Sequence, residues 1–216
     1  MLEHMPAWLG HSLKGLRAGA DALVIARSGL GSESASGAKA GTGFATLDLT
    51  SPAFAHEGRL PPRFTADGDG VSPPLLWSAP PEGTAALALI VEDADAPTPQ
   101  PLVHAIVWHI AADRLRLAEG AIRADGAGTS DGDVGRNSYL REGWLPPDPP
   151  SGHGEHRYAF QLFALDAALG DPGVSPGRTA LVEAMSGHVL AAGLLIGTYS
   201  REEAAPVGPA SSAMPA

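Results

Sequence analysis

Carboxylates, imidazoles and a phenol occur where strands of this chain are expected to end. Asp93 and Asp95 lie in the sequence Asp-Ala-Asp-Ala-Pro, His104 follows shortly afterwards, and His156 and Tyr158 come later. Side chains two residues apart in a strand share a face, so His156 and Tyr158 are expected to point the same way. The sequence predicts that these groups meet in one small polar pocket.

Anion binding is the first interpretation of this pocket. A carboxylate within a few ångströms favours the protonated form of an imidazole, so Asp93 would make His104 and His156 cationic donors near neutral pH. Together with the Tyr158 hydroxyl and nearby backbone N–H groups, they would suit a phosphate monoester or another small oxyanion.

Two other classes of function use the same residue types. A hydrolase could use Asp93, His104 and His156, but a serine nucleophile needs a base and an oxyanion site, and no Gly-x-Ser-x-Gly elbow occurs. A zinc protein could use the same three side chains, but the compact His-Glu-x-x-His spacing is absent. We therefore predict a non-catalytic binding protein without metal or cofactor, with the hydrolase as the alternative.

Short apolar runs separated by Pro- and Gly-rich stretches must position these residues. The pattern predicts a mainly β, antiparallel architecture with a few peripheral helices. Residues 85–91 are continuously apolar, as in a strand buried on both faces. A second strand is predicted over 102–110, which would place four alternate side chains on one face: His104, Ile106, Trp108 and Ile110. A third strand is predicted over 156–165.

The N-terminal segment, residues 1–43, is predicted to lie outside this domain. Apolar residues recur at helical spacing over 6–27, which predicts an amphipathic helix, and 28–43 is a Gly/Ser/Ala linker. The helix is expected to pack on its own domain or on a second copy of the chain, which makes it the candidate homodimer contact. A partner or membrane-surface contact is the alternative.

The C-terminal part of the domain, which spans 44–201, is expected to end in a helix and a strand. The helix is predicted over 179–193, with His188 on its apolar face as a core residue, and the strand over 194–200. Residues 202–216 are rich in Pro, Ala and Ser and are predicted to be a disordered tail.

Composition narrows the classes of partner and compartment. The chain of 216 residues carries 24 acidic and 14 basic residues, a net charge of -10, which disfavours nucleic-acid binding. It has no cysteine, which removes disulfides and thiolate sites and fits a cytoplasmic protein. No apolar run approaches the length of a membrane span, so no integral membrane association is expected.

Several motifs, in this order and spacing, resemble the phosphatidylethanolamine-binding protein family, in its bacterial-type Raf kinase inhibitor-like branch. The matching segments are 71–77 (VSPPLLW), 93–97 (DADAP), His104, 147–158 (PDPPSGHGEHRY), 187–191 (GHVLA) and 197–199 (GTY). The resemblance covers about residues 45–201 and implies an antiparallel β-sandwich-like fold. It also implies a surface pocket for phosphate-type groups, including the phosphoethanolamine head, and regulation of a protein partner such as a kinase. Matched by position, its pocket residues are Asp93, His104, Pro149, Pro150, His156 and Tyr158.

Neighbouring residues are expected to support the pocket. Asp95 would cap its own loop, Pro97 would shape it through a hypothetical cis Ala96–Pro97 bond, and Arg157 would face away and form an ion pair. Asp148 stands where the family has a cysteine. Its charge would weaken anion affinity or favour a ligand with a cationic group. His109 and His153 are off the expected faces and are left out of the site.

Overall fold

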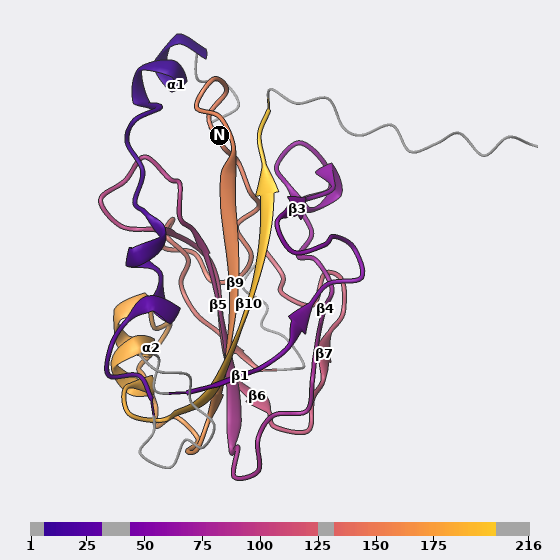
Figure 1. Ribbon diagram of the computed structural model, residues 1–216, viewed down its shortest axis with the longest axis vertical. Coiled ribbons are helices and arrows are strands. Elements are labelled where there is room, and N and C mark those ends of the chain that lie inside the picture. The colour runs from indigo at the N-terminus through magenta and orange to yellow at the C-terminus, as the bar shows by residue number, and fades with distance from the viewer. Residues whose placement is uncertain (1–6, 32–43, 125–131, 202–216) are drawn as a thin grey trace, which may run out of the picture.

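Two β-sheets packed around a shared core form the body of the molecule (Figure 1). The computed structural model describes residues 7–31, 44–124 and 132–201. The larger sheet has the order β1-β10-β9-β5-β6-β8, with β3 also paired to β10, and the smaller sheet has the order β2-β4-β7. The strands are β1 (Ala45–Thr46), β2 (Leu49–Thr50), β3 (Gly58–Arg59), β4 (Leu75–Trp77), β5 (Ala86–Asp93), β6 (Leu102–Ala111), β7 (Arg116–Leu117), β8 (Asp133–Val134), β9 (His156–Leu165) and β10 (Val189–Tyr199).

The mainly β fold predicted from the sequence is confirmed. Strands β10, β9, β5, β6 and β8 are antiparallel, whereas the short β1 and β3 run parallel to β10. Every residue of β5 is buried, as the apolar run at 85–91 indicates. Strand β9 has the predicted bounds.

The two faces of the larger sheet bury different apolar clusters. Alternate side chains of β9, such as Phe160 and Leu162, face the smaller sheet and form the main core with Trp77. Their neighbours, such as Phe163, face the other way and pack with Val24 of the N-terminal segment and with α2. The helices and 3₁₀ turns are α1 (Ala7–Leu13), η2 (Ala20–Ala22), η3 (Val24–Ala26), η4 (Pro62–Phe64) and α2 (Arg178–Met185).

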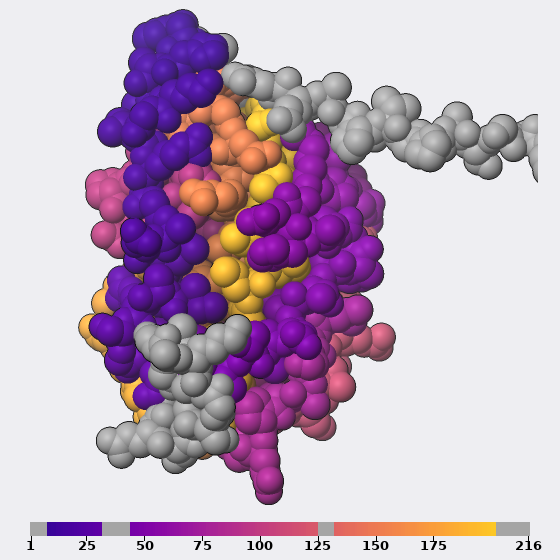
Figure 2. Space-filling view, viewed as in Figure 1, coloured from indigo at the N-terminus to yellow at the C-terminus, as the bar shows by residue number. Residues whose placement is uncertain are grey.

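The N-terminal helix is shorter than predicted, but the segment packs on its own domain, which is one of the two expected arrangements. Only α1 (Ala7–Leu13) is α-helical, and residues 14–31 continue along the outer face of the larger sheet as turns and extended chain. Gly19 adopts φ 91°, which a helix does not accommodate. We call residues 7–31 the N-terminal strap. It runs down one side of the molecule (Figure 2).

The predicted C-terminal helix also ends early. It stops at Met185, because Gly187 takes φ 80° and turns the chain into β10, which begins at Val189. His188 therefore lies in this turn and not on an apolar helix face. Its side chain is half exposed and Nδ1 lies 2.8 Å from Asp166 Oδ1, so the prediction of a core histidine is wrong.

Neither α-helix of the described ranges has the length and hydropathy of a membrane-spanning segment. Most of the predicted linker, from residue 32 to 43, and the predicted tail, 202–216, lie outside the described residues.

Candidate functional site

A small cavity lies where β5, β6 and β9 meet the loops at one end of the larger sheet. Its volume is about 30 Å³, room for about two water-sized groups. Five of the six predicted ligand-facing residues line it, as do Pro97 and Asp148: the five are Asp93, His104, Pro149, Pro150 and His156. The remaining lining residues were not predicted: Ala96, Leu102, Tyr139, Leu145 and Pro146.

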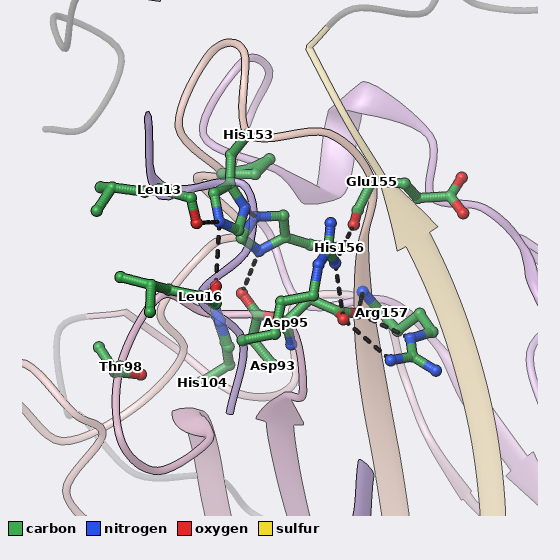
Figure 3. A network of polar contacts seen from close by, with 12 residues as sticks. Leu13, Leu16, Asp93, Asp95, Thr98, His104, His153, Glu155, His156 and Arg157 are labelled. Atoms are coloured by element: carbon green, nitrogen blue, oxygen red, sulfur yellow. Dashed lines mark hydrogen bonds and ion pairs between the residues drawn. The ribbon is translucent and has the colours of Figure 1, made fainter. Parts of the chain in front are cut away.

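Asp93 closes strand β5 with both carboxylate oxygens engaged. Oδ1 accepts a hydrogen bond from the backbone N–H of Asp95 at 2.8 Å, and Oδ2 lies 2.7 Å from His156 Nδ1 (Figure 3). All described peptide bonds are trans. The cis Ala96–Pro97 hypothesis is therefore wrong, and the Asp93–Asp95 hydrogen bond holds this turn instead.

A β-bulge places His104 beside the cavity. Val103 pairs with Glu92 and Ala105 with Val91, so His104 is one extra residue on β6. The bulge removes His104 from the face of Ile106, which contradicts the predicted alternation. A second irregularity, at His109 with φ 54°, moves Ile110 to the main core.

His104 presents a hydrogen-bond acceptor. Its Nδ1 donates to the carbonyl oxygen of Leu145 at 2.6 Å, so the neutral ring carries its proton there and Nε2 holds a lone pair. Burial lowers the pKa of His104 below its ordinary value, despite the opposing charge of Asp93. The expectation of a cationic His104 near neutral pH is thus wrong, because desolvation outweighs the carboxylate.

His153, which the strand alternation had left out, extends the site toward the strap. Gly152 and Gly154 adopt φ 81° and 101° and fold His153 back onto His156, with 2.6 Å between His153 Nδ1 and His156 Nε2. His153 Nε2 in turn lies 3.0 Å from the carbonyl oxygen of Leu13 (Figure 3). The two glycines around a histidine were the only sequence signal for this arrangement.

Three contacts of hydrogen-bond length link Leu13 O through His153 and His156 to Asp93. Burial and the neighbouring His156 lower the pKa of His153. A neutral His153 can donate from Nε2 to Leu13 O and accept at Nδ1 from His156 Nε2.

The prediction that the Asp95 side chain caps its own loop is wrong, because Asp93 caps this turn. The Asp95 carboxylate binds Arg157 and Arg17 from outside the cavity. It accepts two hydrogen bonds from the Arg157 guanidinium, at 2.8 and 2.9 Å, and pairs with Arg17 of the strap at 2.7 Å. Burial alone would raise the pKa of Asp95, but the hydrogen bonds from Arg157 and Arg17 lower it to about 2. Arg157 faces away from the cavity in this ion pair, as β9 alternation requires.

The negative charge of Asp148 is compensated locally. Asp148 lines the cavity, and one oxygen lies 2.6 Å from Arg201 Nη2. Arg201 also contacts Asp67 at 2.8 Å. Although burial alone would lower the Arg201 pKa, the hydrogen bonds to Asp67 and Asp148 raise it, so the guanidinium stays charged.

Tyr158 lies behind the cavity and not in its lining. Its ring packs edge-on against His104, with centroids 5.1 Å apart, and burial raises its pKa well above the ordinary value. Tyr158 Oη and His104 Nε2 are both buried, and neither has a hydrogen-bond partner among the described residues.

Comparisons with known proteins agree with the sequence resemblance. The family model described as phosphatidylethanolamine-binding protein matches residues 50–200. The UPF0098 protein of Methanothermobacter thermautotrophicus is 41% identical over 157 residues, covering 72% of this chain and 99% of its own length. The UPF0098 protein of Chlamydia trachomatis is 37% identical over 163 residues, covering 72% of this chain and 100% of its own length.

Two crystal structures of family members have similar folds. The homologue CT736 from Chlamydia trachomatis superposes with a TM-score of 0.65 at 35% identity and covers 73% of this chain and 99% of its own. YbcL of E. coli, described as a member of the mammalian family, gives a TM-score of 0.66 at 28% identity and covers 72% and 99%. From the family model, its relatives and the shared fold, we conclude that this chain belongs to the phosphatidylethanolamine-binding protein family, in its bacterial and archaeal branch.

Proposed function

We propose that the chain is a non-catalytic binding protein whose cavity takes a small anion of the phosphate type. The observation that carries this proposal is the buried Nε2 atom of His104, a cavity-lining residue, which has no hydrogen-bond partner among the described residues. A buried polar group without a hydrogen bond costs roughly 1–3 kcal/mol. A ligand that supplies this hydrogen bond recovers that free energy on binding.

The Nε2 atom of His104 complements a monoprotonated phosphate group. Neutral His104 offers an acceptor at Nε2, which suits a P–OH donor. The small cavity limits the buried part of the ligand to a compact head group, with larger substituents outside the mouth beside Tyr139.

Electrostatic compensation around the cavity supports an anion over a cation. Asp93 contacts His156 Nδ1 and the backbone N–H of Asp95, and Asp148 pairs with Arg201, so each carboxylate has hydrogen-bond partners in the protein. The interpretation of Asp148 as a site for a cationic ligand group is correspondingly weaker.

The hydrolase alternative has no specific observation in its favour. Within the described residues, the cavity lining contains no serine or threonine that could act as a nucleophile. Both oxygens of Asp93 already accept hydrogen bonds. A preformed pocket suffices for a binding protein, so the proposal assigns no catalytic residue.

Histidine-detected NMR titration with inorganic phosphate and phosphoethanolamine tests the proposal. We expect the His104 and His156 ring resonances to shift with a common dissociation constant, and His104→Gln to weaken binding roughly tenfold or more. His188→Gln, at a half-exposed histidine in the turn before β10, is the matched control. Unmoved His104 and His156 signals at saturating ligand, or unchanged affinity in His104→Gln, would overturn the proposal.

A further inference from the structure

A second hollow, separate from the cavity, lies between the end of the strap, the segment before β6 and the start of α2. Its volume is about 530 Å³. The segment 137–140 divides the two sites, since Tyr139 lines the cavity whereas Ser138 and Leu140 line this second groove. The residues of the arginine groove, as we call it, are Arg27, Gln100, Val103, Arg136, Asn137, Ser138, Leu140, Gly177, Arg178 and Thr179.

The arginine groove is positively charged on a protein of net charge -10. Its described lining includes three arginines and no carboxylate. Arg178 is compensated, because its guanidinium pairs with buried Glu92. Arg27 and Arg136 are exposed, and neither forms an ion pair with any residue in the described ranges. Two guanidinium groups without an ion-pair partner in the described ranges thus face one open hollow.

Helix α2 adds positive potential to the same place. It begins at Arg178 after Gly177, which has no side-chain cap, and its first internal hydrogen bond runs from Leu181 N to Gly177 O. A helix N-terminus carries a partial positive charge and favours anions. Arg136 Nη2 nevertheless lies 4.0 Å from where a Cβ on Gly177 would stand. A free cation beside the positive end of a helix is unfavourable, and an anion between them would relieve the repulsion.

Hydroxyl groups of the lining supply further donors. Ser138 Oγ accepts a hydrogen bond from Val103 N at 2.8 Å, which leaves its own O–H to donate. Thr179 lies in the first turn of α2 and brings a second hydroxyl. Guanidinium forks, hydroxyls and helix-terminal amides are the groups that recognise phosphate oxygens.

We propose that the arginine groove is a second anion site, which binds the phosphate group of a small phosphorylated molecule between Arg27, Arg136 and the N-terminus of α2. The groove volume leaves room for an organic substituent beside the phosphate. This site does not depend on the function proposed for the cavity, because no lining residue is shared between the two.

Amide NMR titration with inorganic phosphate at constant ionic strength tests this second site. We expect the amides of Ser138, Thr179 and Ala180 to shift together, with a dissociation constant of their own. The double variant Arg27→Gln, Arg136→Gln should weaken this set of shifts about tenfold or more and leave the His104 and His156 shifts unchanged. Arg116→Gln, an exposed arginine on β7 in the smaller sheet, is the matched control.

Each outcome decides for or against the arginine groove. Phosphate-induced shifts at the groove that persist in His104→Gln support a site independent of the cavity, even if the cavity itself binds nothing. Groove amides that do not move, or that move equally in the double variant, would overturn the proposal. The same holds if sodium chloride at matched ionic strength produces the same shifts, since that response is non-specific screening.

Discussion

His104 is held in a form that makes anion binding dependent on pH. Its Nδ1–H is committed to Leu145 O, and burial lowers its pKa, so protonation occurs at Nε2, beside the cavity. An anion at Nε2 favours the imidazolium form. Binding a fully ionised anion therefore requires uptake of a proton, and by linkage a lower pH strengthens the complex.

Sulfate is the probe for this coupling, because it does not titrate in the neutral range. We expect its affinity for the cavity to rise as the pH falls from 8 to 5.5, by up to about tenfold per pH unit. His104→Gln should flatten this dependence at the cavity, whereas His188→Gln should preserve it. Affinity that is independent of pH in the wild-type protein would contradict proton uptake by His104. The readout is the ring resonance of His156, which lines the cavity and not the arginine groove.

At the scale of elements, the N-terminal strap completes the candidate site although the family match starts only at residue 50. Leu13 and Leu16 supply carbonyl acceptors to His153, and Arg17 pairs with Asp95. Further along, buried Glu92 accepts a hydrogen bond from Val24 N at 3.0 Å. The strap thus fixes both the histidine pair and the pocket loop.

Close packing at Gly10 makes the strap testable. A Cβ at Gly10 would lie 2.0 Å from the backbone oxygen of Ser151, a contact that backbone must move to relieve, whereas a Cβ at Gly15 meets nothing within 4 Å. We expect Gly10→Ala to displace α1 and deprive His153 of its acceptors, with faster hydrogen exchange over residues 8–17 and a shifted His153 resonance. Gly15→Ala should leave both unchanged. Equal exchange in the two variants would show that α1 is not held by this contact.

For the whole molecule, the Asp95 ion pairs with Arg17 and Arg157 tie the strap to the larger sheet and couple stability to pH. The folded-state pKa of Asp95 is about 2, below its ordinary value of 3.8. Its contribution is therefore complete above about pH 4, where the carboxyl is ionised even in the unfolded chain, and it is lost as the pH falls toward 2. The difference corresponds to about 2 kcal/mol.

Urea unfolding of Asp95→Asn checks this contribution. The variant should be less stable than the wild type by about 2 kcal/mol at pH 7, and the gap should close between pH 4 and pH 2, where the wild-type carboxyl also becomes neutral. Asp113→Asn, at an exposed turn, should show no such gap. A difference that stays constant down to pH 2 would mean that Asp95 acts through packing and not through its charge.

Local patterns in the sequence were sufficient for the central strands of the larger sheet, whereas Pro149 and Pro150 of the cavity lining were predicted from the family resemblance. Period-two alternation gave β9 its bounds and its inward face, and the apolar run at 85–91 predicted the buried strand β5. Asp93, His104 and His156 were predicted to meet in one pocket and do line the cavity, although His104 reaches it through a bulge and not through the predicted alternation. The central strands depend on short-range periodicity, which the sequence itself carries.

Tertiary structure alone decided the protonation and support of the site. The bulge that sets the direction of His104 follows from register between β5 and β6, and its lowered pKa follows from burial by surrounding segments. The return of His153 to His156 and to Leu13 requires contact between the strap and a loop distant in sequence. Desolvation and long-range hydrogen bonds depend on which segments pack together, and no local spacing in the sequence records that.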